Sequence, residues 1–462
     1  MHQSCPRRIG KSAGALCGCS KRMQKGSAAA SASPCESGSV GDPPDLEEVV
    51  SPCQEGEFEF TEVNGVRLRF QIWGTVRAGA VPIVFTPGGQ GGIAEPSTKG
   101  VCLHPTRFLS KSQIEQELLQ GRRPSWLRAK VKSVFAPFVC PCGLMEGTWA
   151  VCTCTQRRVL QYLLKETAEK CRLREKKGDG GEENEGGEGA AKERPDFFLL
   201  RWDRRNCGSS DYSYGDELSR RGEPEIQAED LACLLSFLEE TKCREGSSES
   251  NGSREESGPG KNTRASQKAK GKEKESQASL APAILVGNSS GARLSLIFAI
   301  RHEPRCAGLV LMNMTQGVLA SAFLAEHYYR QYSRIAREGG MQAVVSSPFY
   351  TRGCRAGGDR KREQLMSTDT EAFCKVTEAW ADWMERGADE GWPAIGVPES
   401  EARKAAGVPS FVLHTFVPED GMHTLEGAQR LGRVLGGNVM SSRMEKIQEW
   451  VPKVAEFIAS IL

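Results

Sequence analysis

The sequence predicts an α/β fold in which a mostly parallel central sheet carries helices on both faces. Apolar runs of strand length, among them residues 282–286 and 307–314, alternate with helix-like segments. These runs are apolar throughout, as is typical of parallel strands that are buried on both faces. Residues 317–404 contain no such run and have helical patterns instead, which predicts a helical lid between two strands.

Composition excludes several classes of protein. The chain has 462 residues, and 39% of them are hydrophobic, a low fraction that predicts unpacked segments. Lys and Arg total 61 and Asp and Glu total 59, so no global charge favours nucleic acid or an anionic membrane. No run of about 18 apolar residues occurs, which predicts no membrane span. We therefore expect no nucleic-acid partner, and the oligomeric state stays open; the motifs described below lead us to expect a small-molecule substrate.

The cysteines and the N-terminus bear on the compartment. The 17 cysteines are scattered through apparent strands and helices, as Cys207, Cys233 and Cys306 illustrate, which predicts reduced thiols packed as small hydrophobes. Residues 1–35 are basic, rich in Ser and Ala, and contain no acid. Two interpretations stay open: an organellar transit peptide (plastid or mitochondrion) within residues 1–40, or a disordered tail on a cytoplasmic protein.

The folded part is predicted to begin with a β-hairpin. Apolar and polar residues alternate over 58–72 on either side of Asn64-Gly65, a strong hairpin signal. Residues 82–86 predict the next strand, and residues 197–202 predict the one after it. Between those two strands, apolar residues recur at helical spacing over 156–173, which predicts the crossover helix.

Two low-complexity segments interrupt this core. Residues 176–192 and 242–279 are rich in charged and small residues and cannot bury enough apolar surface to offset their ordering entropy. Such insertions are tolerated because loop-closure entropy grows slowly with loop length. The predicted organisation is a tail at 1–55, a core at 56–316 with insertions at 94–155, 174–195 and 242–280, a helical cap at 317–405, and the end of the core at 406–462.

Helical and strand patterns alternate regularly after residue 226. Apolar residues at helical spacing mark the helices, and short apolar runs mark the strands. The sequence predicts core helices at 226–238, 292–301 and 444–461, core strands at 282–286, 307–314 and 409–414, and lid helices at 322–338 and 370–386.

The sharpest chemical signal is Gly-Asn-Ser-Ser-Gly at residues 287–291. It directly follows a predicted buried strand and directly precedes a predicted helix, which is the context of a nucleophile elbow. The flanking glycines suit a turn so tight that side chains would collide, and Ser289 would be held in strained backbone geometry. The turn would present Ser289 at the carboxyl edge of the sheet, where open α/β sheets bind ligands.

Three motifs together resemble the α/β-hydrolase superfamily, and within it the proline-iminopeptidase-like and related cap-bearing hydrolases. They are Thr-Pro-Gly-Gly-Gln-Gly-Gly at 86–92, Trp-Asp-Arg-Arg-Asn-Cys-Gly-Ser-Ser-Asp at 202–211, and the 287–291 turn. The resemblance covers residues 58–462 once the insertions are removed. It implies the α/β-hydrolase fold, and it is more specific for fold than for substrate.

The resemblance also implies an oxyanion hole. Its two donors would be the backbone N–H groups of Gly89 and Ser290, which would stabilise a developing oxyanion. Pro87 stands where many members carry His, a departure that leaves backbone donors intact. The segment at 202–211 resembles the family's turn after a strand, and we assign it a structural role rather than a catalytic one. For Arg204 and Arg205 three roles stay open: lining the pocket, packing in the core, or exposure to solvent.

In this fold the acid and the histidine follow the nucleophile in the chain. Glu419 and Asp420 are the carboxylates placed soon after the strand at 409–414, and Asp420 is chosen. No histidine lies beyond His423, and residues 436–442, where one is expected, have none. Three interpretations of the base stay open: His423 is an atypically placed base, a lid histidine such as His327 folds in, or the base is missing. His423 could equally be a surface residue before the helix that follows it. His414, at a strand end, is assigned to the core.

Two Cys-x-Cys pairs, at Cys140 and Cys142 and at Cys152 and Cys154, would together offer four thiolates to zinc. Zinc ribbons more often use Cys-x-x-Cys, and this segment lies in an insertion. A chance cluster is therefore the favoured interpretation. We expect neither a metal nor another cofactor.

These observations predict a serine hydrolase that cleaves a small ester, amide or peptide-like substrate through an acyl-enzyme. Its catalytic residues would be Ser289, Asp420 and His423. The alternative is a noncatalytic ligand-binding protein on the same fold, motivated by the missing late histidine. Aromatic residues of the lid would line the pocket or pack in the core: Phe323, Tyr328, Tyr329, Trp380 and Trp383.

Overall fold

The structure is a computed structural model, and it describes most of the chain from residue 53 onward. The described ranges are 53–89, 93, 153–178, 197–248, 279–416, 422–443 and 446–462. All of them belong to one compact unit, residues 47–462. The predicted tail up to residue 52, most of the three predicted insertions and Asp420 lie outside the described residues.

Within the described ranges, eight strands form a single sheet in the order β1-β2-β4-β3-β5-β6-β7-β8. β1 and β2 form an antiparallel hairpin, β2 pairs antiparallel with β4, and every other pairing is parallel. The predicted mostly parallel sheet is therefore confirmed. The strands are β1 (Glu55–Val63), β2 (Val66–Trp73), β3 (Val81–Thr86), β4 (Phe197–Trp202), β5 (Ala283–Asn288), β6 (Cys306–Met312), β7 (Ser410–Phe416) and β8 (Asn438–Arg443).

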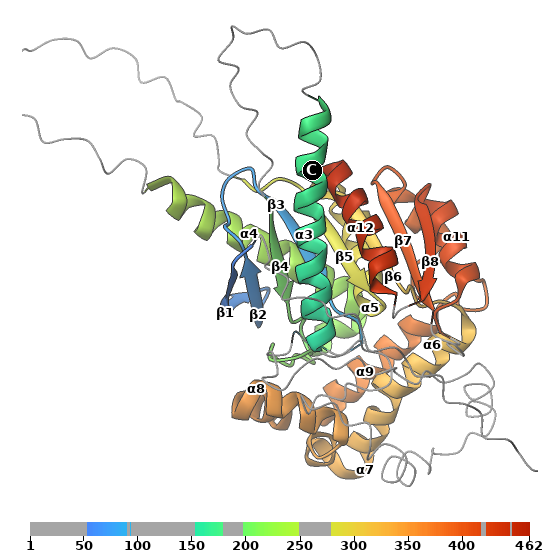
Figure 1. The fold of residues 1–462 in the computed structure, drawn as a ribbon. Helices are drawn as coiled ribbons and strands as arrows, with labels where there is room; N and C mark the ends of the chain where they lie inside the picture. Colours follow the sequence, from blue (N-terminus) through green and yellow to red (C-terminus); the bar gives the residue numbers. More distant parts are fainter. Residues whose placement is uncertain are drawn as a thin grey trace, which may run out of the picture. The chain divides into compact units, whose positions relative to one another are not determined.

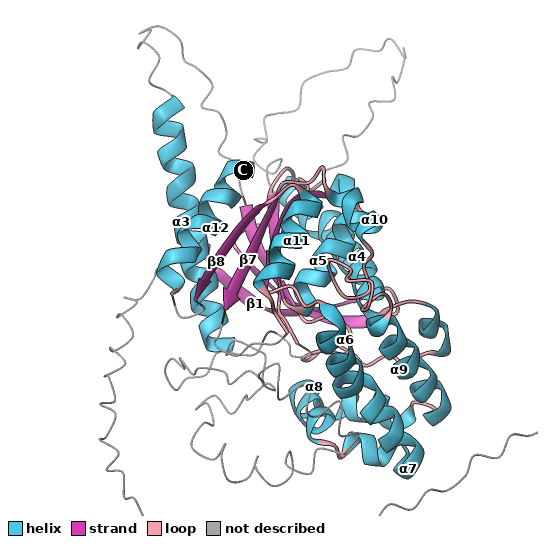
Figure 2. Ribbon diagram, turned by 90° about the vertical axis from the view of Figure 1, so that its right-hand side faces the viewer, coloured by secondary structure: helices cyan, strands magenta, loops and turns pink. Residues whose placement is uncertain are grey.

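Helices cover both faces of this sheet (Figures 1 and 2). One face is covered by α3 (Thr153–Gly178) and α12 (Ile447–Ile461), whose apolar residues pack with Ile83 and Ile284 of the strands. The other face is covered by α4 (Glu223–Ser248), α5 (Ser290–Arg301) and α11 (Leu425–Leu435). The two apolar layers hold the sheet from both sides, as parallel strands require.

A set of helices lies between β6 and β7 in the chain and is gathered beyond one end of the sheet (Figures 1 and 2). Two of its helices were predicted, but α8 was missed because its sequence is rich in glycine and charge, and it bends at Gly358 (φ 71°). We call this set the inserted helices. It consists of α6 (Gly317–Ala325), the π-helix η5 (Glu326–Arg330), α7 (Gln331–Val345), α8 (Pro348–Ser367) and α9 (Thr370–Glu385).

Short helices complete the described elements, and one strand departs from the sequence-based expectation. The short helices are η2 (Asp216–Arg220), η4 (Glu303–Arg305), α10 (Glu399–Ala402) and η6 (Arg403–Ala405). Residues 436–442, where a histidine was expected and no strand was predicted, mostly form β8, an edge strand whose side chains are largely exposed. The α4 helix also continues to Ser248, into the region predicted to be an insertion.

Two predictions based on composition can be compared with the described residues. None of the described helices combines the length and the apolar character of a membrane span. Among the described cysteines, Cys207 and Cys306 are buried as predicted, whereas Cys233 lies on an exposed side of α4. The four cysteines of the Cys-x-Cys pairs have no described side chain.

Candidate active site

Ser289 lies at the turn between β5 and α5 and has the backbone geometry of a nucleophile elbow. Its φ of 52° and ψ of −112° are strained for a residue other than glycine. The two flanking glycines make the turn possible: a Cβ on Gly287 would lie 2.6 Å from the Ala292 nitrogen, and one on Gly291 would lie 2.8 Å from the Pro87 oxygen. Since both obstacles are backbone atoms, no larger residue fits either position.

His423 is the histidine that reaches Ser289. Its Nε2 lies 3.2 Å from the Ser289 Oγ, and the residue is only 4% exposed. The interpretation of His423 as a surface residue is therefore wrong. His327 instead stays within its own helical segment, where its Nδ1 lies 2.9 Å from the Phe323 carbonyl oxygen and its ring stacks on Phe323.

Two neighbours hold the backbone of His423 in place. Thr424 caps α11 by accepting a hydrogen bond from the Gly427 N–H at 3.2 Å, which fixes the residue next to His423. His414 of β7 donates from Nε2 to the His423 carbonyl oxygen at 3.1 Å, and its Nδ1 lies 3.0 Å from the Ser441 Oγ. His414 is buried as predicted, and it also positions His423, which the sequence did not reveal.

The proposed oxyanion loop lies directly against the elbow. A Cβ on Gly88 would be 3.0 Å from the Ser289 Cβ, so the loop and Ser289 are in close approach. The Ser290 hydroxyl donates to the Gly89 carbonyl oxygen at 2.9 Å, and Arg204 donates to the same oxygen. The Ser290 N–H is at the first position of α5, where a helix offers no internal acceptor.

The turn after β4 has the structural role that was predicted for it. Asp203 is fully buried, accepts hydrogen bonds from the Ser209 N–H at 2.8 Å and from the Ile93 N–H, and so ties this turn to the glycine-rich segment. Burial raises the pKa of Asp203 from its ordinary value, and Arg69 opposes that shift. Arg205 forms two 2.7 Å hydrogen bonds to Asp230, so the interpretation of these arginines as solvated is wrong.

A buried asparagine that the sequence analysis missed joins three strand ends beneath the site. Asn313, in left-handed geometry after β6 (φ 52°), donates to the Asn288 Oδ1 at 3.1 Å and to the Thr415 Oγ1 at 2.8 Å. The Thr415 N–H in turn donates to the Asn313 Oδ1 at 2.8 Å. Asn288 precedes Ser289, so this network fixes the elbow relative to β7.

The lid aromatics are mostly packed rather than exposed. Phe323, Tyr329, Trp380 and Trp383 are buried, which agrees with the predicted core packing.

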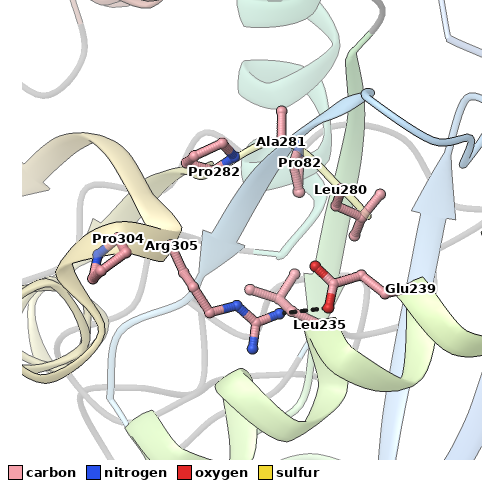
Figure 3. A pocket seen from close by; sticks show the side chains of 8 residues that line it. All are labelled: Pro82, Leu235, Glu239, Leu280, Ala281, Pro282, Pro304 and Arg305. Atoms are coloured by element: carbon pink, nitrogen blue, oxygen red, sulfur yellow. Dashed lines mark hydrogen bonds and ion pairs between the residues drawn. The ribbon is translucent and has the colours of Figure 1, made fainter. Parts of the chain in front are cut away.

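A small hollow lies away from Ser289, at the amino ends of β3 and β5. It has a volume of about 60 Å³ and is lined in part by the Arg305–Glu239 ion pair (Figure 3). Ligand pockets span roughly 300 to 1,000 Å³, so this hollow is too small for a substrate.

Comparisons with known proteins give similarity only at the level of structure. No protein-family model and no curated protein sequence matches the chain. A thermophilic esterase from Thermogutta terrifontis is 13% identical, with a TM-score of 0.35 over 88% of this chain and 99% of its own. The enol-lactonase from Burkholderia xenovorans LB400 is 15% identical, with a TM-score of 0.37 over 87% of this chain and 99% of its own. The proline iminopeptidase from Mycobacterium smegmatis is 10% identical, with a TM-score of 0.35 over 88% of this chain and 98% of its own. The strand order and the elbow after β5 give this chain the α/β-hydrolase fold that its motifs predicted.

Proposed function

We propose that this protein is a serine hydrolase that cleaves a small ester, amide or peptide-like substrate through an acyl-enzyme. The observation that carries the proposal is the 3.2 Å approach of the His423 Nε2 to the Ser289 Oγ at a strained elbow. This distance is within hydrogen-bond reach, as a nucleophile and its base require. The noncatalytic alternative was motivated by the missing late histidine, and the approach of His423 to Ser289 favours the hydrolase over it.

In the proposed reaction, the Ser289 oxygen attacks the substrate carbonyl carbon while its proton passes to the His423 Nε2. The resulting oxyanion accepts hydrogen bonds from the N–H groups of Gly89 and Ser290, each of which is worth about 3 kcal/mol in comparable sites. His423 then gives the proton to the leaving group, and later activates the water that releases the acyl group. Asp420 is proposed to accept a hydrogen bond from the Nδ1–H of His423, which would fix the required tautomer.

We further propose that the inserted helices act as the cap over this site. Several of their residues contact the segments that surround Ser289. Tyr329 donates to Glu223 at the start of α4 at 2.7 Å, and Lys361 donates to the Gly208 carbonyl oxygen at 2.8 Å. A cap fixed to the core in this way would set the size of the substrate.

Labelling of the full chain with a fluorophosphonate probe tests the proposal. Wild-type protein should be labelled, Ser289→Ala should not, and His423→Gln should slow labelling by about 100-fold or more. Ser295→Ala is the matched control, because Ser295 is a buried serine of the same helix whose hydroxyl has no described partner. Folded wild-type protein that stays unlabelled from about pH 6 to about pH 9 would instead support the noncatalytic alternative.

A further inference from the structure

Arg293 is a buried cation that forms no ion pair with any described residue. It lies in α5 and is only 2% exposed. Its Nε and Nη1 atoms are buried and donate no hydrogen bond to any described group. A guanidinium withdrawn from water costs free energy unless an anion or hydrogen bonds compensate it. A site of this kind needs a negatively charged partner.

The Arg293 side chain points toward the elbow and the inserted helices. Its backbone N–H donates to the Ser289 carbonyl oxygen at 3.2 Å, so it lies one helical turn after the nucleophile. Side chains of a helix lean toward its N-terminus, which in α5 is the end that carries Ser289. The Arg293 Cζ lies 5.8 Å from the ring centroid of Trp383 in α9, so the guanidinium faces the inserted helices rather than the sheet.

The charged groups around Arg293 leave one positive charge in excess. Arg204 is a second buried guanidinium, and it donates to the Gln227 side chain and the Gly89 carbonyl oxygen, neither of which is charged. Glu223 is the carboxylate of this cluster, and it accepts hydrogen bonds from Asn206 and Tyr329. Burial lowers the pKa of Arg293 and Arg204 adds to that shift, whereas Tyr329, Tyr328 and Glu223 oppose it. Two cations and one carboxylate therefore share a buried site.

The helix that faces this cluster has an irregular turn. Residues Glu326–Arg330 form a π-helix, which carries Tyr328 and Tyr329 toward the cluster. Such turns are uncommon and occur frequently at functional sites. Tyr329 of this turn donates to Glu223 at 2.7 Å, and Glu223 raises the pKa of Arg293 through space without forming an ion pair with it among the described contacts.

We propose that Arg293 binds a carboxylate of the substrate, so that the enzyme prefers acidic esters or amides, such as half-esters of dicarboxylic acids. This inference rests on the proposed hydrolase function. A single carboxylate matches the single excess charge, whereas a phosphate dianion would leave a net negative charge in a buried site. The planar guanidinium fork suits a carboxylate that binds through both oxygens.

A matched pair of esters tests the preference. p-Nitrophenyl butyrate is neutral, and mono-p-nitrophenyl glutarate presents a carboxylate at the end of a similar acyl chain. Arg293→Gln should lower the ratio of kcat/KM for the glutarate ester over the butyrate ester by about 10- to 100-fold, mainly through KM. Arg293→Lys should restore part of the ratio. Arg301→Gln is the matched control, because Arg301 lies at the end of the same helix and pairs with Glu225 instead.

A binding measurement separates this inference from the hydrolase proposal. Glutarate should raise the unfolding temperature of Ser289→Ala and should not raise that of Ser289→Ala with Arg293→Gln. Inorganic phosphate, used in parallel, should have the smaller effect, and a larger effect of phosphate would overturn the assignment to a carboxylate. A ratio of esters that is the same in wild type and Arg293→Gln, in protein that fluorophosphonate still labels, would overturn the anion site alone. Absent labelling would overturn the hydrolase.

Discussion

The Ser289→Gly variant should have a larger free energy of unfolding than the Ser289→Ala variant. Both variants lose the hydroxyl and its 3.2 Å contact with His423, so this loss cancels in the comparison. What differs is the backbone, because a φ of 52° with a ψ of −112° costs any residue with a Cβ, but not glycine, about 1 to 3 kcal/mol.

The expected magnitude follows from two opposing terms. Glycine has more conformational freedom in the unfolded chain, which favours alanine by about 0.4 to 1 kcal/mol. Subtracting that term from the relieved strain leaves Ser289→Gly more stable than Ser289→Ala by about 1.3 kcal/mol at the midpoints of the two ranges, within limits of about 0 to 2.6 kcal/mol. At an ordinary helical position the order is reversed, since glycine is less favourable than alanine by about 1 kcal/mol.

Urea unfolding of the full chain, with the free energy extrapolated linearly to water, measures the difference. The control pair is Ser295→Gly and Ser295→Ala, at a buried position in the body of α5, where alanine should be the more stable variant. A Ser289→Gly variant no more stable than Ser289→Ala, with the control pair in its normal order, would refute a strained elbow.

Three further predictions address the neighbourhood of the site. Gly291→Ala should abolish fluorophosphonate labelling and lower the free energy of unfolding by at least about 2 kcal/mol, because its Cβ would meet backbone oxygens, including that of Pro87 at 2.8 Å. Asn313→Ala should cost about 2 to 4 kcal/mol in urea unfolding and slow labelling, because it leaves Thr415 and Asn288 unsatisfied; an unchanged midpoint would count against the network. Burial lowers the pKa of Lys361 to about 8, below its ordinary 10.5, so the unfolded chain binds more protons above that pH. Relative to Lys361→Met, wild type should gain about 2 kcal/mol of stability between about pH 7 and about pH 9.5, and a flat difference would contradict the lowered pKa.

Local patterns account for the parts of the fold that the sequence predicted well. The β4 strand was placed at the residues where it is found, because an apolar run there is bounded by a turn. The edge strand β8 was missed because most of its side chains are exposed, so no alternation of apolar and polar residues marks it. The α8 helix was missed because glycine has a low helix propensity and weakens the helical pattern of its sequence, which contains Gly353, Gly357 and Gly358.

The candidate site was predictable only where its geometry is local. Ser289 and its two glycines are consecutive in the chain, so strand, turn and helix could be recognised together. Asn313 resembles an ordinary turn residue in the sequence, and its role depends on strands that meet only in the folded sheet. Arg293 resembles any helical arginine, because the lack of a partner is a property of packing rather than of sequence.

The position of His423 explains how an α/β-hydrolase fold can do without a histidine near its last strand. His423 follows β7 rather than β8, yet β8 still contributes, because Ser441 contacts His414 and His414 donates to the His423 carbonyl oxygen. A carbonyl oxygen only accepts hydrogen bonds, so the His414 Nε2 must carry a proton, and a neutral His414 can then accept at Nδ1 from the Ser441 hydroxyl. The support acts on the backbone of His423 rather than on its ring. Under the proposed mechanism, a base that follows β7 and is held through its carbonyl oxygen and by the Thr424 cap takes the place of a base after β8.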